Sequence, residues 1–250
     1  MRIATITSRC LTVLAALIAL PAFAAETQVA VAANFSEPAK QIAAGFERAT
    51  GHKAVLAFGA SGAFYTQISH GAPFEVFLSA DAERPAKAEV EGLAVPGTRF
   101  TYAVGQLVLF SAAPGIVGTK GEILRSGRFD KIAIADPATA PYGLAAIEAM
   151  RQLGVYDALR PKIVTGSSIA QAYQFTATGA AQLGFVALSQ VITVPGGSRW
   201  IVPANLHTRI DQQAVLLKVG EKNPAAIAFI KYLKSRAALA IVRRYGYTTR

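Results

Sequence analysis

The sequence predicts an α/β fold built from two lobes with a ligand cleft between them. Apolar runs of strand length alternate with helical patterns, at the spacing typical of parallel strands joined by crossover helices. The alternation pauses at a long apolar run, residues 102–111, and then starts again, with no repeat or low-complexity linker between the halves. We therefore expect the chain to leave the first lobe near Tyr102 and re-enter it near Pro203, which would give two crossings and a hinged cleft.

The first lobe is expected to open with three strand–helix pairs. Gly51 ends the first helical pattern, and His70-Gly71 ends the second. Ligands of parallel sheets bind beyond the carboxyl ends of the strands, where Asn34 and Ser61 lie. The expected strands are 27–33, 54–58 and 74–79, and the expected helices are 38–50, 62–69 and 84–91.

The second half repeats the alternation, and its last helices are expected to return to the first lobe. The expected strands are 132–135, 162–165, 183–186, 201–203 and 211–219, and the helical segments are 121–125, 144–153, 169–178, 187–191 and 225–244. This order predicts one lobe from residues 25–104 with 206–250, and a second lobe from residues 105–205.

The N-terminus has a basic start, a short apolar core and a small-residue cleavage site, as secretory signal peptides do. These parts are Arg2 with Arg9, residues 11–20 and residues 22–24. Residues 1–24 are therefore predicted to be a signal peptide, and the mature chain to begin near Ala25 or Glu26. Cys10 is the only cysteine, so the mature chain would have no disulfide and no cysteine-bound metal.

Composition indicates a folded, exported protein. The chain has 250 residues, of which 52% are hydrophobic and 16% charged, so burial is ample and disorder is not expected. Its formal charge of +10 falls to +8 when Arg2 and Arg9 leave with the signal peptide. A basic surface can steer a small anion or simply aid solubility. Export and the lack of a basic run with interleaved aromatics argue against nucleic acid as a partner.

Four strand-to-helix turns carry neutral residues where backbone N–H groups have no partner within a helix. In the clearest, residues 29–38, an apolar run turns at Asn34 and enters a helix. Such turns can hold an anion without a positive side chain. Each residue could equally be a plain helix cap, and the tyrosine among them could be a buried residue bonded to the other lobe. The four candidates are Asn34, Ser61, Tyr142 and Ile169.

Signals of an enzyme are absent from the sequence. Ser61 does not lie in a G-x-S-x-G motif, and no paired carboxylates, phosphate loop or H-E-x-x-H motif occurs. Asp81 and Asp136 follow strands and are expected to serve turns. The histidines show no metal-ligand spacing and are expected to be surface residues; they are His52, His70 and His207.

A cradle of N–H and O–H donors without a carboxylate favours a fully ionised oxyanion. Hydrogen phosphate keeps a proton for part of the time near neutrality, because the second pKa of a phosphoryl group is about 6. Sulfate, molybdate and tungstate carry no proton there. The sequence therefore favours a tetrahedral dianion, and the choice among dianions depends on cavity size.

Several segments together resemble the periplasmic molybdate-binding proteins, the receptors of molybdate ABC importers, over essentially the whole mature chain. The resemblance implies a type II periplasmic binding protein that closes on molybdate or tungstate, holds the metal only as its oxyanion, has no cofactor and acts as a monomer beside a membrane permease. It implies ligand contacts from Asn34, Ser61, Tyr142 and the amide of Ile169, with Ala33 contributing through its backbone. The segments are 32–35, 58–62, 71–81, 136–143, 183–186 and 244–247.

The chain departs from the commoner pattern of that family at several positions. Asn34 stands where a serine is usual, Tyr142 where a small residue is usual, and Ala187 where a ligand tyrosine is usual. Another branch of the family has Asn and Tyr at the first two positions, often with a hydroxyl residue where Ala33 stands. Three alternatives remain: a receptor for sulfate or another oxyanion, an exported enzyme that uses Ser61, and an extracytoplasmic sensor domain.

Overall fold

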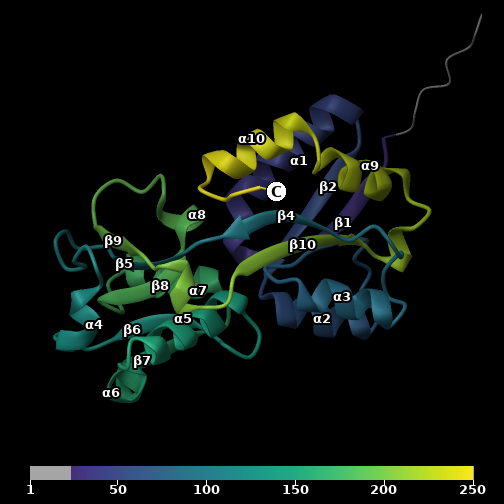
Figure 1. Cartoon of the computed structure of the whole chain (residues 1–250). Coiled ribbons are helices and arrows are strands. Elements are labelled where there is room, and N and C mark those ends of the chain that lie inside the picture. Colours follow the sequence, from purple (N-terminus) through teal and green to yellow (C-terminus); the bar gives the residue numbers. More distant parts are fainter. Residues whose placement is uncertain (1–23, 250) are drawn as a thin grey trace, which may run out of the picture.

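A computed structural model describes residues 24–249, so the predicted signal peptide lies outside the described residues apart from Ala24. The chain forms two five-stranded mixed sheets, each flanked by helices, which confirms the predicted two-lobed α/β fold (Figure 1). The strand order is β2-β1-β3-β10-β4 in the first lobe and β7-β6-β8-β5-β9 in the second.

In the first lobe, the helices α1, α9 and α10 cover one face of the sheet, and α2 and α3 cover the other (Figure 1). Val29, Val31 and Phe46 are among the fully buried side chains of this core. The strands are β1 (Glu26–Ala32), β2 (Lys53–Gly59), β3 (Val76–Leu78), β4 (Phe100–Gly105) and β10 (Ile210–Leu216). The helices are α1 (Ser36–Thr50), α2 (Ser61–Ser69), α3 (Glu83–Val90), α9 (Pro224–Tyr232) and α10 (Arg236–Arg244), with the short 3₁₀ turns η1 (Ala33–Phe35) and η4 (Lys218–Gly220).

The second lobe has its own core, to which Ile132, Met150 and Phe185 contribute fully buried side chains. Its strands are β5 (Leu107–Ser111), β6 (Ile132–Ala135), β7 (Ile163–Gly166), β8 (Leu183–Ala187) and β9 (Ser198–Ile201). Its helices are α4 (Glu122–Ser126), α5 (Pro141–Gln152), α6 (Tyr156–Leu159), α7 (Ile169–Ala177) and α8 (Leu188–Val191), with the 3₁₀ turns η2 (Arg160–Lys162) and η3 (Ala204–Leu206).

The chain crosses between the sheets twice, from β4 to β5 and from β9 to β10. The apolar run at 102–111 is thus two strands in different sheets, separated by Gln106 alone. The C-terminus adds a contact at the first crossing, because Thr248 pairs with Val104 and Gln106 Nε2 donates to the Gly246 carbonyl at 3.3 Å. The lobe limits inferred from the sequence stay a prediction.

Most elements expected from the sequence are present, with shifts of a few residues at their ends. The helix expected from residue 144 begins at Pro141, because proline lacks an N–H and suits the first helical turn. The long helical segment at 225–244 is two helices that meet at Ser235, the N-cap of the second. Within residues 24–249, no helix is both long and apolar enough to cross a membrane.

Candidate functional site

A small cavity lies between the lobes, at the point where strands end and helices begin. The first lobe contributes the end of β1 with η1, the end of β2 with the start of α2, and Ala80, while the second contributes the starts of α5 and α7. Among the described residues, no charged side chain lines it. The lining residues are Ala32, Ala33, Asn34, Gly59, Ala60, Ser61, Ala80, Ala140, Pro141, Tyr142 and Ile169. The structure therefore brings together all five residues expected at the site, Ala33 included.

The topology explains this convergence. Strands β1 and β2 are parallel neighbours, as are β6 and β7, so their carboxyl ends meet at one edge of each sheet. The chain enters a helix or 3₁₀ turn within three residues of the ends of β1, β2 and β7, and enters α5 after a short loop that follows β6. The first N–H groups of a helix have no intrahelical partner and carry a partial positive charge. The cavity can therefore attract an anion without a cationic side chain.

The hydroxyl oxygen of Ser61 already accepts a hydrogen bond from the protein. The Ala80 N–H donates to Ser61 Oγ at 2.9 Å, and the side chain is buried. The hydroxyl proton takes no part in that bond. Because Ser61 lines the cavity, this proton is available to an acceptor placed there.

Tyr142 lines the cavity, and its hydroxyl is bonded to the other lobe. Gln212 Nε2, on strand β10 of the other lobe, donates to Tyr142 Oη at 3.1 Å. Burial raises the pKa of Tyr142 well above its usual value near 10, so the phenol stays neutral. Pro141 has no N–H, and the backbone N–H of Tyr142 is therefore the first amide that helix α5 can offer.

Asn34 uses both hydrogens of its carboxamide inside the protein. Asn34 Nδ2 donates to Gln212 Oε1 and to Tyr247 Oη, each at 2.9 Å. Its backbone, in the turn η1, is the part that remains for a ligand. Ile169 begins helix α7 behind Ser168, whose hydroxyl accepts from Gln171 N at 3.4 Å and is a helix cap.

The lobes touch on more than one side of the cavity, so the structure is a closed arrangement. The Gly62 N–H donates to the Thr139 carbonyl at 2.8 Å, and Arg84 Nη2 donates to the Ala138 carbonyl at 3.2 Å. Arg84 is also paired with Asp81 at 2.5 Å, within its own lobe.

The two aspartates expected to serve turns do so, and of the three histidines expected at the surface His70 is exposed while His52 and His207 are half-buried. Asp81 accepts from the Arg84 N–H at 2.9 Å, and Asp136 accepts from the Ala138 N–H at 3.0 Å. The three histidines lie apart, and no group of metal-binding side chains occurs within residues 24–249. Ala187, at the end of β8, is buried and offers no hydroxyl; its N–H donates to Gln190 Oε1 at 3.0 Å.

Sequence reasoning missed the polar side chains behind the cavity, namely Gln212, Ser189 and Tyr247. Gln212 is fully buried in strand β10, and nothing in its local sequence marks it. Tyr247 belongs to the segment 244–247, which contributed to the family resemblance without a role assigned to it. These residues lie from 58 to 213 positions along the chain from the groups that they bond.

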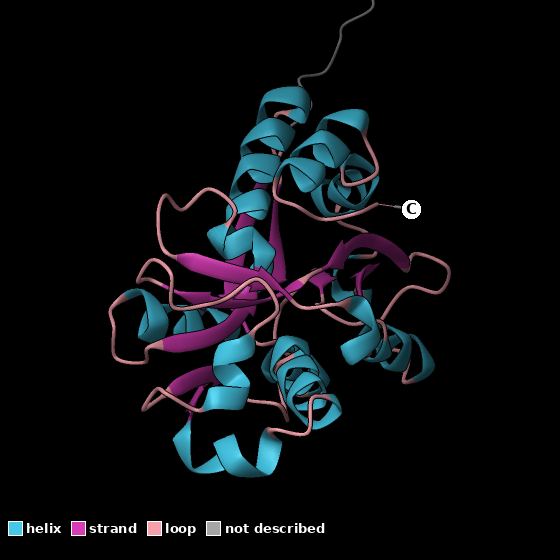
Figure 2. Ribbon diagram, turned by 60° about the vertical axis from the view of Figure 1, so that its left-hand side comes forward, coloured by secondary structure: helices cyan, strands magenta, loops and turns pink. Residues whose placement is uncertain are grey.

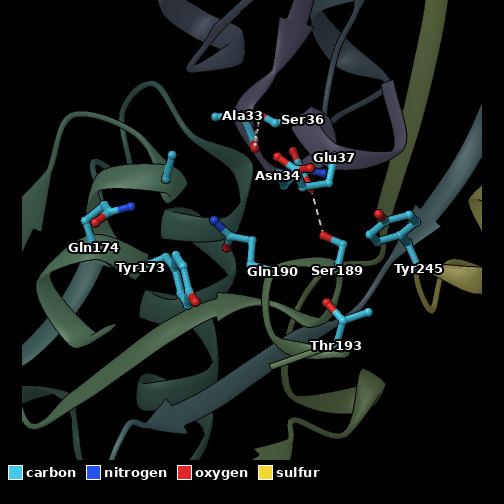
Figure 3. Close-up of a pocket in the computed structure, with 11 residues that line it drawn as sticks. Ala33, Asn34, Ser36, Glu37, Tyr173, Gln174, Ser189, Gln190, Thr193 and Tyr245 are labelled. Carbon is cyan, nitrogen blue, oxygen red and sulfur yellow. Dashed lines mark hydrogen bonds between the residues drawn. The ribbon is translucent and has the colours of Figure 1, made fainter. Parts of the chain in front are cut away.

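A larger pocket, of about 290 Å³, shares Ala33 and Asn34 with the small cavity and lies between α1, α7 and α8 (Figure 3). Its remaining lining is mostly neutral and polar, including Tyr173, Gln190 and Thr193, with Glu37 as its one charged residue. Figure 3 shows Ser189 and Asn34 meeting across this pocket from opposite lobes.

Fold and site together define an extracellular binding protein with its ligand held between two lobes. The family model described as bacterial extracellular solute-binding protein matches residues 27–248, and the chain belongs to this family. The molybdate-binding protein ModA of Rhodobacter capsulatus is 60% identical over 232 residues, which cover 93% of this chain and 92% of the relative. ModA of Azotobacter vinelandii is 54% identical over 236 residues, covering 93% and 94%.

The solved structure of the Azotobacter vinelandii periplasmic molybdate-binding protein superposes with a TM-score of 0.87 at 43% identity, covering 90% of this chain and 99% of that one. The resemblance to molybdate-binding proteins inferred from the sequence motifs is therefore confirmed. So is the type II periplasmic binding fold.

Proposed function

We propose that this protein is a periplasmic receptor for molybdate, and for tungstate, which it delivers to the membrane permease of an ABC importer. The observation that carries the proposal is the neutral cavity between the lobes, where four helix or turn starts converge in a chain 60% identical to a molybdate-binding protein. Export through the predicted signal peptide and action as a monomer belong to the same proposal.

The proposed contacts are hydrogen bonds to the oxygens of the oxyanion, so the metal has no protein ligand and no cofactor takes part. Ser61 would contribute its hydroxyl, and the turns at Ala33, Asn34, Tyr142 and Ile169 their backbone N–H groups. A backbone donor is assigned to Asn34 because both hydrogens of its carboxamide are used within the protein. Tyr142 can offer its backbone N–H and also the hydroxyl proton, which takes no part in the bond from Gln212. Charge-assisted hydrogen bonds of this kind are stronger than neutral ones.

Binding would work by closure of a hinge. Residues from both lobes line the cavity, so a ligand that contacts both stabilises the closed arrangement over the open one. Catalysis plays no part in the proposal, since Ser61 Oγ bonds a backbone N–H and no histidine or carboxylate lines the cavity.

Isothermal titration of the ligand-stripped mature protein with molybdate, tungstate, sulfate and phosphate tests the proposal. We expect one-to-one binding of molybdate and tungstate, with sulfate much weaker and phosphate weaker still. Tight sulfate binding with weak molybdate binding would assign the protein to another oxyanion. No heat with any of the four would overturn the oxyanion site.

A further inference from the structure

Six buried polar side chains form one hydrogen-bonded cluster behind the cavity: five that meet between the lobes, which we call the hinge cluster, and Tyr102, whose hydroxyl donates to Gln212 Oε1 at 3.0 Å. Each of them is at most 5% exposed. To the hinge cluster, the first lobe contributes Asn34, Gln212 and the C-terminal Tyr247, while the second contributes Tyr142 and Ser189.

The cluster joins the lobes at two points. Gln212 Nε2 donates to Tyr142 Oη at 3.1 Å, and Ser189 Oγ donates to the Asn34 carbonyl at 2.7 Å. Tyr247 lies at the second point, because its Oη is 2.8 Å from both the Asn34 carbonyl oxygen and Ser189 Oγ. The same oxygen accepts from Asn34 Nδ2 at 2.9 Å. One hydroxyl therefore contacts both lobes and a residue that lines the cavity.

Packing fixes this hydroxyl in place. The Tyr247 ring packs edge-on against Phe35, with centroids 5.3 Å apart. Gly246, with φ of +79°, carries the chain so close to the second lobe that a Cβ would lie 2.7 Å from Leu188 Cδ2. A side chain at Gly246 would thus be disfavoured by both the backbone conformation and the lack of space. Because this residue is glycine, the chain can bring Tyr247 to the contact between the lobes.

Opening of the lobes would separate Ser189 from Asn34 and Tyr247, while Asn34 and Tyr247 would stay together in the first lobe. A buried polar group that loses its partner pays a desolvation cost unless water reaches it. The hydroxyl of Tyr247 therefore contributes more to the closed arrangement than to the open one.

We propose that Tyr247 is a positioning residue for the ligand: its hydroxyl holds Asn34 at the cavity and, through Ser189, holds the lobes closed, so that it slows release of the bound oxyanion. This inference rests on the function proposed above. It assigns a role to the C-terminal segment 245–248, which does not line the cavity.

Stopped-flow kinetics of molybdate with Tyr247→Phe tests the role, since phenylalanine keeps the ring and removes only the hydroxyl. We expect release about tenfold faster, with an association rate within about twofold of the parent protein. Tenfold corresponds to about 1.4 kcal/mol. Loss of affinity through association alone, or unchanged release, would overturn the proposal.

Tyr245→Phe is the matched control. Tyr245 Oη accepts from Gln41 Nε2 at 2.6 Å, and both residues belong to the first lobe. This variant removes a tyrosine hydroxyl two positions away whose hydrogen-bond partner lies in the first lobe, so its release rate should equal that of the parent. An equal effect of both variants would show general destabilisation in place of positioning.

Ser189→Ala provides a second route if Tyr247→Phe folds poorly. It removes the partner from the other lobe, so release should again be faster, and the double variant should release more slowly than the sum of the two barrier changes predicts. Strictly additive effects would mean that the two hydroxyls act separately, against the proposal.

A readout without ligand separates this proposal from the proposed function. Labels at Val90→Cys and Gln152→Cys, both exposed and in different lobes, report the distance between the lobes. Tyr247→Phe should shift the ligand-free protein towards longer distances. A parent protein that fails to bind molybdate would overturn the proposed function alone, whereas an unchanged distance together with unchanged release would overturn the role of Tyr247 alone.

Discussion

Ser61 and Tyr142 carry the two side-chain hydroxyls among the residues that line the cavity, and they are used differently. Each accepts one hydrogen bond from the protein, Ser61 from its own lobe and Tyr142 from the other. The serine hydroxyl belongs to the cavity wall, whereas the phenol belongs to the contact between lobes. Two hydroxyl groups in one site thus differ in role: that of Ser61 serves ligand binding, and that of Tyr142 serves closure of the lobes.

Removal of the serine hydroxyl should weaken binding without unfolding the protein. We expect Ser61→Ala to lower the affinity for molybdate by roughly 1–3 kcal/mol, because a hydrogen bond to a charged ligand is lost in a buried cavity. Titration calorimetry measures the change. Ser69→Ala, on the exposed end of the same helix, is the control, and equal affinities of the two variants would remove Ser61 from the site.

The buried tyrosines predict a loss of stability at high pH. Burial raises the pKa of Tyr247 to about 12, and the pKa values of Tyr102 and Tyr142 are also raised well above 10. Below pH 10 these groups are neutral in both the folded and the unfolded chain, so they add no pH dependence there. Above pH 10 the unfolded chain ionises first, and the free energy of unfolding falls by up to about 1.4 kcal/mol per pH unit and tyrosine.

Denaturant titrations between pH 9 and pH 11 check this effect in the parent protein and in Tyr247→Phe. The variant should lose stability less steeply above pH 10, because it has one fewer buried phenol. Parallel curves would show that Tyr247 ionises as easily in the folded protein as in the unfolded chain.

Among the elements, helix α2 and the loop before α5 contact each other directly, one from each lobe. The N–H of Gly62 bonds the Thr139 carbonyl at 2.8 Å, and a Cβ on Gly62 would lie 2.9 Å from Thr139 Cα. Glycine is unfavourable inside a helix, so helix propensity does not explain why Gly62 occurs in α2. The closed contact between lobes explains why a residue without a side chain occurs there.

Gly62→Ala should therefore have opposite effects on the open and closed arrangements. Alanine favours the helix by about 1 kcal/mol over glycine, so ligand-free stability should hold or rise. Crowding against Thr139 should weaken molybdate binding by about 1–3 kcal/mol. Melting curves measure the stability and titrations measure the affinity, with Ala63→Gly at the exposed neighbouring position as control. Parental affinity of Gly62→Ala would mean that closure leaves more room than this structure shows.

At the scale of the whole molecule, two sheets with their helices are joined by two chain crossings and by the C-terminal segment (Figures 1 and 2). The lobes can move relative to each other because few covalent links connect them. A ligand held by both lobes adds its binding free energy to the closed form.

Molybdate should therefore stabilise the protein against heat. At a free concentration of 100 times Kd, a ligand that binds only the folded state adds about 2.7 kcal/mol. For a chain of this size, that corresponds to a rise in Tm of roughly 5–11 °C. Scanning calorimetry with molybdate, and with sulfate as the control anion, measures the shift; equal shifts would contradict the expected selectivity.

Much of this architecture could be predicted because its signals are local. Strand and helix periods, glycines at helix ends and proline at the start of α5 are encoded within a few residues. The alternation of elements predicted the parallel strand pairs, such as β1 with β2 and β6 with β7, whose carboxyl ends place the ligand site. The turns that carry Asn34, Ser61, Tyr142 and Ile169 could be expected at one cavity on these grounds, whereas Ala33 was expected from the family resemblance. The alternation did not predict that β10 and β5 run antiparallel to their neighbours, which makes both sheets mixed.

By itself, the sequence determined the two-lobed α/β fold and the neutral turns that meet between the lobes. Only the tertiary structure decided what the side chains at those turns do. The carboxamide of Asn34 bonds Gln212 and Tyr247, 178 and 213 positions away, and the phenol of Tyr142 bonds Gln212, 70 positions away. The physical reason is that backbone turns follow from neighbouring residues, whereas the partner of a buried polar side chain is set by which distant segments pack beside it.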